Sequence, residues 1–389
     1  MQPTGVLETS KATNPLKALL GYGQSMWLDY IRRDLLTSGQ LKTMIEEDGL
    51  RGMTSNPSIF EKAIGESSLY DDILKSLASR SDLDTTARYE QIAIRDIQGA
   101  ADILRPVYES SQFKDGYVSL EVSPLLAMKT QQTIDEGRRL WKTVNRENVM
   151  IKVPGTAEGL PAIRQLIGES INVNVTLLFA QEVYEKVAEA YILGLEDLAK
   201  RGGNLKKMAG VASFFISRID TLVDSMIDDK LKTADANQQT LLKSLKGKIA
   251  IANGKLTYQR YQKIFSGPRW EALASKGAQT QRVLWASTST KNPAYRDVMY
   301  VEELIGPETV NTMPPATIDA FRDHGRLRNS LTEDVAGAQK VMDDLAKAGI
   351  SISEVTTKLT NDGVKLFADA FHKLLAVVEK STQTKGKTA

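Results

Sequence analysis

Ile171-Asn172-Val173-Asn174-Val175-Thr176 alternates apolar and polar residues more regularly than its flanking segments, and this pattern points to the architecture of the chain. Successive side chains of a β-strand point to opposite faces, so the valines share one face and the two asparagines and the threonine share the other. The valine face suits packing against helices, whereas the polar face needs a polar space to point into. The stretch therefore predicts a buried strand that borders an internal polar cavity.

Polar side chains end the other apolar runs in the same way. Val149-Met150-Ile151-Lys152-Val153 has the composition of a buried strand and carries Lys152 near its end. Ser119 and Glu121 share one face of the run 117–122, and further runs end in polar residues, namely Asp29, Asn56 and Ser213. Barrel enzymes collect active-site groups from the carboxyl ends of several strands, whereas an open sheet binds ligands at one switch point. We therefore predict a (β/α)8 barrel, or TIM barrel, in the α/β class.

Eight short apolar runs alternate with longer amphipathic segments, at 25–31, 50–55, 117–122, 149–153, 171–177, 209–214, 282–287 and 310–313. This alternation is typical of a parallel α/β fold. We expect a single domain over residues 1–380, with inserted helices at about 230–280 and two further helices near the end, at roughly 333–348 and 353–380. Residues 381–389 lack apolar anchors, and we expect them to be a disordered tail.

Composition excludes several classes of function. The 50 Lys and Arg residues nearly balance the 48 Asp and Glu residues, which argues against a nucleic-acid binder. The chain has no cysteine and two histidines, so thiolate chemistry and cysteine-ligated metals are excluded, and we expect neither metal nor cofactor. No apolar run approaches the roughly 20 residues that span a bilayer, and no signal peptide is evident at residue 1. We therefore expect a cytoplasmic protein without membrane contact; the oligomeric state is left open.

Lys152 is the most informative single residue. Burying an ammonium group without a partner costs several kcal/mol, roughly, so a buried lysine tends to lose its proton. A neutral amine in an apolar pocket is a nucleophile that forms a Schiff base with a carbonyl substrate. The alternative is a lysine at a strand end whose stem packs while its ammonium group reaches water.

Four motifs, in order along the chain, resemble those of the transaldolase family. These are Thr54-Ser55-Asn56-Pro57-Ser58, Ile151-Lys152-Val153-Pro154-Gly155-Thr156, Asn172-Val173-Asn174-Val175-Thr176-Leu177-Leu178-Phe179 and Ser213-Phe214-Phe215-Ile216-Ser217-Arg218. The resemblance runs from about Asp29 to Pro315. Each motif alone is weak evidence, but their order and spacing together are highly specific.

The resemblance implies a transferase of the pentose phosphate pathway. It would move a dihydroxyacetone unit, so that sedoheptulose 7-phosphate and glyceraldehyde 3-phosphate interconvert with erythrose 4-phosphate and fructose 6-phosphate. Lys152 would form the Schiff base, and Asp29 would exchange a proton with the hydroxyl group of the departing or arriving aldehyde. Glu121 would shuttle protons through a water that Thr176 helps to position.

The resemblance also implies which residues bind the sugar phosphate. Asn56, Asn174 and Ser213 would hold the hydroxyl groups of the three-carbon unit, because amides offer both donors and acceptors. Phe215 would form a wall of the pocket. Arg218 would bind the phosphate, and Lys291 stands where the family usually has a second cation, commonly arginine.

Two alternatives remain. A fructose-6-phosphate aldolase of the same superfamily would release free dihydroxyacetone, but such enzymes are shorter and typically carry glutamine and tyrosine where this chain has Glu121 and Phe215. A barrel that binds sugar phosphates without catalysis has no need of Lys152, Asp29 and Glu121 together. The bulky residues around Asp29, the Pro154-Gly155-Thr156 loop and the added length indicate a divergent subgroup.

Overall fold

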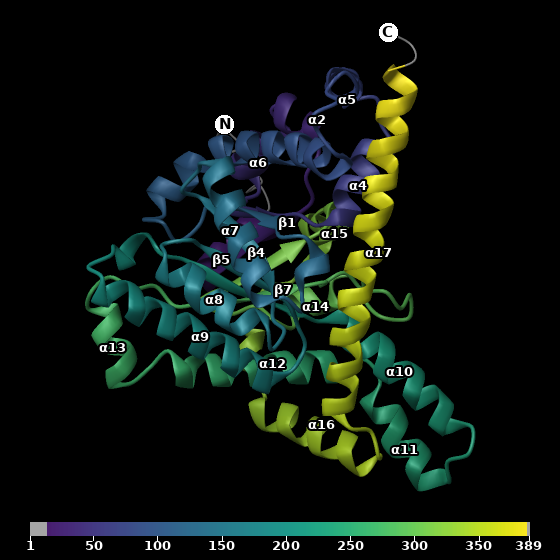
Figure 1. The fold of residues 1–389 in the computed structure, drawn as a ribbon. Helices are drawn as coiled ribbons and strands as arrows, with labels where there is room; N and C mark the ends of the chain where they lie inside the picture. The colour runs from purple at the N-terminus through teal and green to yellow at the C-terminus, as the bar shows by residue number, and fades with distance from the viewer. Residues whose placement is uncertain (1–13, 387–389) are drawn as a thin grey trace, which may run out of the picture.

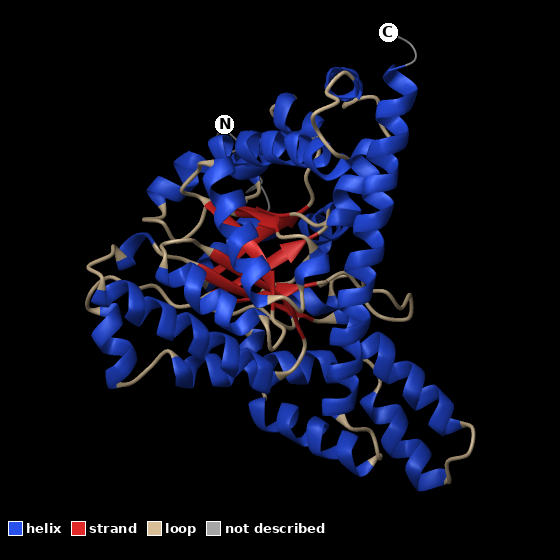
Figure 2. Ribbon diagram, viewed as in Figure 1, coloured by secondary structure: helices blue, strands red, loops and turns tan. Residues whose placement is uncertain are grey.

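The computed structural model describes residues 14–386, in which eight parallel strands close into a barrel in the order β1 to β8. Figure 2 shows the strands at the centre of a shell of helices. This confirms the predicted (β/α)8 barrel, and each strand lies within a few residues of its predicted run. The strands are β1 (Gln24–Asp29), β2 (Gly52–Thr54), β3 (Tyr117–Glu121), β4 (Val149–Pro154), β5 (Val173–Leu178), β6 (Gly210–Phe215), β7 (Arg282–Ala286) and β8 (Thr309–Met313).

The surrounding helices follow the strands along the chain (Figure 1). They are α1 (Pro15–Ala18), α2 (Arg33–Thr37), α3 (Gln40–Glu47), α4 (Pro57–Gly65), α5 (Asp71–Ala78), α6 (Thr85–Ser110), α7 (Thr130–Val144), α8 (Gly159–Gly168), α9 (Gln181–Lys200), α10 (Ser217–Leu231), α11 (Ala236–Leu245), α12 (Ile249–Ile264), α13 (Pro268–Ala274), α14 (Met299–Glu302), α15 (Pro315–His324), α16 (Val335–Lys347) and α17 (Ile352–Gly386). Short 3-10 turns complete the set, at η1 (Leu19–Tyr22), η2 (Pro124–Leu126), η3 (Leu205–Lys207) and η4 (Ser330–Thr332).

The interval between β6 and β7 holds helices α10 to α13, as the sequence predicted for residues 230–280. Helices α10 and α11 form a pair that projects from the barrel in Figure 1. Helix α17 is the long helix, drawn in yellow, that runs along one side of the molecule from α10 to α5. Because α17 also packs against β5, its middle lies beside the barrel.

Aromatic and β-branched side chains fill the space between strands and helices. Trp27 of β1 is fully buried, and its indole lies over the backbone of β2. A Cβ atom at Gly52 would come within 2.5 Å of that ring, so only glycine allows β1 and β2 to pair at this register.

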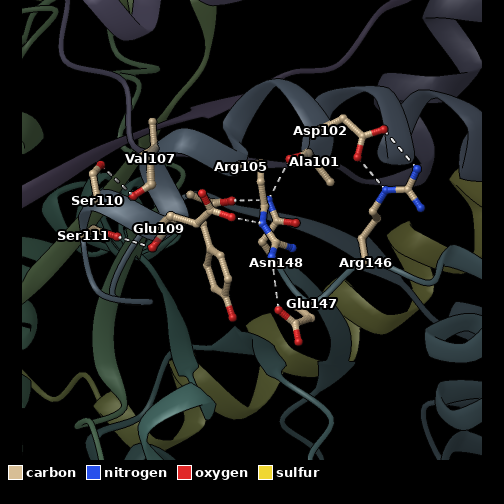
Figure 3. A network of polar contacts seen from close by, with 12 residues as sticks. Ala101, Asp102, Arg105, Val107, Glu109, Ser110, Ser111, Arg146, Glu147 and Asn148 are labelled. Atoms are coloured by element: carbon tan, nitrogen blue, oxygen red, sulfur yellow. Dashed lines mark hydrogen bonds and ion pairs between the residues drawn. The ribbon is translucent and has the colours of Figure 1, made fainter.

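A polar network fixes the end of α6 to the segment that enters β4 (Figure 3). Asn148 donates from its amide to the carbonyl of Ala101 at 2.8 Å and to that of Gly116 at 2.9 Å. At the surface, Arg146 pairs with Asp102 in a two-contact ion pair. These bonds satisfy buried backbone carbonyls and fix where β4 begins, three residues before Lys152.

The end of the chain corrects one prediction. Helix α17 continues to Gly386, so residues 381–386 are helical rather than disordered, and Thr382 is buried against the preceding turn. Residues 387–389, the remainder of the predicted tail, lie outside the described residues. Within residues 14–386, none of the helices has the length and apolar composition that crossing a bilayer requires.

Candidate active site

Strand register places three of the predicted residues side by side. Glu121 of β3 pairs with Lys152 of β4, and Lys152 pairs with Asn174 of β5. Glu121 is the last residue of β3 and Lys152 lies in the second half of β4, toward the end where a barrel carries its active site. Asn174 is the second residue of β5, and the register brings it level with Lys152. The alternation of side chains in the sequence therefore predicted correctly that these polar groups face one interior.

Lys152 is buried, with 6% of its side chain exposed, but it is not without partners. Its Nζ lies 3.5 Å from Oε2 of Glu121, whose side chain is 5% exposed, and it donates to the carbonyl of Ser55 at 3.2 Å. The ring of Phe367, from α17, lies with its centroid 5.6 Å from the same nitrogen. The predicted buried lysine is confirmed, while its ion pair with Glu121 replaces the unpartnered state that we considered from sequence.

Asp29 is the last residue of β1. It lies close enough to Lys152 for the positive charge of that residue to act on the Asp29 carboxyl group. Its Oδ1 accepts a 2.7 Å hydrogen bond from the hydroxyl of Thr54, which also contacts the hydroxyl of Thr312 at 2.8 Å. Burial raises the pKa of the Asp29 carboxyl, and the Lys152 ammonium and the Thr54 hydroxyl oppose that rise. A carboxyl group in this position can both take up and return a proton.

Glu121 and Thr176 contribute buried oxygens that lack hydrogen bonds. Neither carboxylate oxygen of Glu121 nor Oγ1 of Thr176 has a hydrogen-bonding partner among residues 14–386. Burial raises the pKa of the Glu121 carboxyl, and the charge of Lys152 opposes the rise. Since buried polar atoms are normally satisfied, these oxygens are available to a substrate or to water.

The side-chain amides of Asn174 and Asn56 already make hydrogen bonds within the protein. Asn174 is fully buried, donates to Ser119 at 3.0 Å and accepts from Ser213 at 2.7 Å. Asn56 caps α4 by accepting from the backbone N–H of Ile59 at 3.1 Å. Each amide keeps one or more hydrogen-bonding positions for a ligand hydroxyl group. Asn56 is thus a helix cap and a cavity residue at once.

Two cations lie together at the other end of the cavity. Arg218 stands in the first turn of α10, with its guanidinium carbon 5.1 Å from the centroid of the Phe215 ring. The ammonium of Lys291 donates to Ser289 at 2.6 Å. Burial lowers the pKa of both groups, and the charge of Arg218 lowers that of Lys291 further. Two cations beside a helix N-terminus are suited to bind an anion.

One cavity of about 190 Å³ connects these groups. Of the predicted site residues, those that line it are Asp29, Asn56, Lys152, Thr176, Ser213, Phe215, Arg218 and Lys291. Asn174 lies beneath it, in hydrogen-bonding contact with Ser213. Glu121 borders a smaller neighbouring cavity and reaches the main one through its ion pair with Lys152. Asn56 lines both cavities.

Sequence reasoning missed several residues that line the main cavity, chiefly Thr54, Ser287, Ser289, Thr312 and Phe367. Thr54 stands two residues before Asn56 in a motif that we had quoted, so its role could have been inferred from the period of the strand. Phe367 carried no comparable signal, because it belongs to a helix far along the chain.

Comparison with known proteins agrees with this geometry. The profile of the Transaldolase/Fructose-6-phosphate aldolase family matches residues 26–378. The chain is 49% identical over 376 residues to the Transaldolase of Trichodesmium erythraeum, covering 95% of this chain and 98% of that protein. It is 49% identical over 372 residues to Transaldolase 2 of a Nostoc species, covering 95% and 97%. It is 46% identical over 365 residues to the Transaldolase of Thiobacillus denitrificans, covering 94% and 99%. The chain therefore belongs to the transaldolase/fructose-6-phosphate aldolase family.

Proposed function

We propose that this protein is a transaldolase, a transferase that carries a dihydroxyacetone unit on Lys152 from a ketose phosphate to an aldose phosphate. The observation that carries the proposal is the burial of Lys152 beside Glu121, in a cavity that also holds Asp29 and the pair of cations. A structural lysine would need the carboxylate of Glu121 as its partner, but neither Asp29 nor the pair of cations. The full-length similarity to proteins named Transaldolase supports the same reaction.

The first stage is formation of the Schiff base. The Lys152 amine attacks the ketone carbon, a C–N bond forms, and the hydroxyl group of the adduct leaves as water to give an iminium ion. Glu121, with a carboxyl pKa raised by burial, gives and takes the protons of this stage. The buried hydroxyl of Thr176 would position the water through which those protons pass.

The second stage is transfer. Asp29 takes the proton of the hydroxyl group on the departing fragment, the neighbouring C–C bond breaks, and its electron pair moves to the iminium nitrogen to leave an enamine. The aldehyde departs. The enamine carbon then attacks the acceptor aldehyde, Asp29 returns its proton to the new hydroxyl group, and water hydrolyses the iminium ion to free the ketose product.

Recognition of the substrate is divided between the two ends of the cavity. Asn56, Asn174 and Ser213 would bind hydroxyl groups of the retained unit, and the ring of Phe215 would pack against its carbon skeleton. Arg218 and Lys291 would bind the phosphate, because an anion there relieves the repulsion between the two cations. Sugar phosphates are thus the proposed ligands. The pentose phosphate pathway and the cytoplasm are proposed as the setting from the family resemblance.

The experiment that tests this function is a partition assay. With fructose 6-phosphate as donor and erythrose 4-phosphate as acceptor, we expect sedoheptulose 7-phosphate to be the main product, with little free dihydroxyacetone. Release of dihydroxyacetone as the main product would instead favour a fructose-6-phosphate aldolase. Binding of both sugars without turnover would favour a barrel that is not catalytic.

The same assay tests the two residues that we used to separate these activities. The double variant Glu121→Gln, Phe215→Tyr is expected to shift the partition toward free dihydroxyacetone. The added tyrosine hydroxyl reaches into the cavity, while the lost carboxyl group no longer exchanges protons at Lys152. An unchanged partition in this variant would contradict the roles that we give to both positions.

A further inference from the structure

Helix α17 brings an aromatic ring to the reacting nitrogen. Phe367 is 8% exposed, lines the main cavity, and has its ring centroid 5.6 Å from Nζ of Lys152. This distance is within the range in which an aromatic face attracts a cation. No strand of the barrel supplies this contact; it comes from a residue of α17 that follows the end of the last strand by more than 50 positions.

The position of Phe367 is fixed from both sides along the helix. One turn later, Phe371 packs edge to face against Tyr89, which packs in the same way against Phe60 of α4. One turn earlier, Gly363 faces Leu177, where a Cβ atom would lie 2.9 Å from the leucine side chain. The ring is therefore held by contacts on both flanking turns rather than by the cavity itself.

The contact at Leu177 lies directly beside the site. Leu177 has a φ of 63°, in the left-handed region that residues other than glycine seldom adopt, and the register between β5 and β6 shifts at this point. The residue before it is Thr176, whose hydroxyl borders the cavity. Within two turns, helix α17 thus makes two contacts with the site. Gly363 packs against the irregular part of β5, and the ring of Phe367 faces Lys152.

We propose that Phe367 is a catalytic residue, whose ring face stabilises the positive charge on the Lys152 nitrogen in the iminium ion. The inference rests on the proposed function, since it requires a Schiff base at Lys152. In the iminium ion the nitrogen is bonded to the ketose carbon and still carries a positive charge. In the enamine and in the amine that attacks the ketone it is neutral, so the ring favours the iminium ion over both of these forms.

The neighbours of the nitrogen explain why a ring is useful there. Glu121 alternates between ionised and protonated forms as it transfers protons, so its attraction for the nitrogen changes during the cycle. The carbonyl of Ser55 and the ring of Phe367 keep the same charge distribution throughout. The ring also excludes water without competing for the proton.

The test replaces Phe367 by 4-fluorophenylalanine and by 3,4,5-trifluorophenylalanine, which weaken the negative ring face progressively while changing its shape little. The full chain is incubated with increasing fructose 6-phosphate and quenched with excess borohydride, and the labelled fraction at Lys152 is measured by mass spectrometry. At alkaline pH, which favours the neutral amine in the free protein, we expect the ketose concentration for half-labelling to rise in step with fluorination, by roughly fivefold for the trifluoro ring. The 4-fluoro ring adds one small atom, so the series retains an informative member if the trifluoro ring disturbs folding.

The matched control is the same pair of replacements at Phe321, a fully buried ring of α15 that lines neither of the two cavities. Fluorination there is expected to leave half-labelling unchanged. Equal labelling curves for all rings at Phe367 would overturn the proposed role of the ring. Absence of label at Lys152 in the unmodified protein would instead overturn the proposed function, so the two failures are distinguishable.

Discussion

The two ends of the barrel both bury charged groups, but they treat them differently. At the amino-terminal end, Arg282 pairs with Asp115 at 2.8 Å and also donates to Ser25 and to the carbonyl of Lys114. Asp115 in turn accepts from Ser25 at 2.8 Å and from the indole of Trp27. At the carboxyl-terminal end, Lys152 and Glu121 are 3.5 Å apart, and both oxygens of Glu121 lack a hydrogen bond among residues 14–386.

This difference distinguishes an ion pair that stabilises the fold from one whose groups take part in catalysis. A buried pair contributes to stability only when further hydrogen bonds satisfy its remaining atoms, as they do around Arg282. An ion pair whose atoms lack some of their hydrogen bonds keeps those atoms available for a substrate. The carboxyl group of such a pair can also take up and release a proton more readily. Burial alone therefore does not identify the active site; a buried ion pair that is incompletely satisfied and lies at a cavity does.

The largest expected effect comes from removing the amine. The variant Lys152→Met should lose transaldolase activity by about 10⁴-fold or more, because it removes the amine that carries the covalent intermediate. The assay is formation of sedoheptulose 7-phosphate, with circular dichroism as the control for folding. Activity within tenfold of the parent protein would show that the nitrogen at position 152 is not the nucleophile.

A substitution at the amino-terminal end of the barrel should change the stability of the fold and leave the catalytic activity unchanged. The variant Arg282→Met leaves Asp115 buried without its charge partner, which should destabilise the protein by about 3–5 kcal/mol. Urea unfolding measures this loss, and kcat per folded molecule should stay within about twofold of the parent value. If this variant instead lost activity while keeping its stability, the contrast between the two ends would be wrong.

The phosphate end of the cavity should affect binding more than turnover. The variant Arg218→Ala should raise KM for fructose 6-phosphate by about tenfold or more, since it removes a charge-assisted bond worth roughly 1.5–3 kcal/mol. Dihydroxyacetone, which has no phosphate, should form its Schiff base with unchanged affinity. An equal loss for both ketoses would argue that Arg218 supports the fold of the site rather than the phosphate.

The smallest effect is a gain in stability. Burial raises the pKa of Asp29, so its ionised form is disfavoured in the folded state. Its contribution to stability is fully present below its ordinary pKa of 3.8 and is lost as the pH rises through the higher folded value. The variant Asp29→Asn should therefore be more stable than the parent at pH 7, within the 0.5–2 kcal/mol that is typical of stabilising substitutions, and should lose activity. Thermal melts at pH 7 and near pH 3.5 measure this difference, which should vanish at the lower pH.

The alternation of side chains within the strands, together with the polar residues at several strand ends, was sufficient to predict the barrel and most of its polar interior. Lys152, Glu121 and Asn174 could be placed on one face because alternate side chains of a strand share a face, and the register confirms that they are neighbours. The same reasoning could not reveal the hydrogen bonds of Arg282 with Asp115, because they join residues that are far apart in the chain and carry no local pattern.

The contribution of α17 was not predictable in the same way. The spacing of Phe367 and Phe371 indicates one face of a helix, but it does not indicate which part of the barrel that face covers. The prediction of disorder from residue 381 was also wrong for 381–386, because polar residues continue a long helix that is anchored by apolar side chains earlier in its length, such as Leu374 and Val378.

The central claim is that a ketose becomes covalently attached to Lys152, and borohydride trapping followed by peptide mass mapping tests it most directly. Incubation of the parent protein with fructose 6-phosphate and borohydride should place one reduced ketose adduct on the peptide that contains residues 149–156, and Lys152→Met should remain unlabelled. An adduct on another lysine, or no adduct at all under conditions of full turnover, would contradict the account.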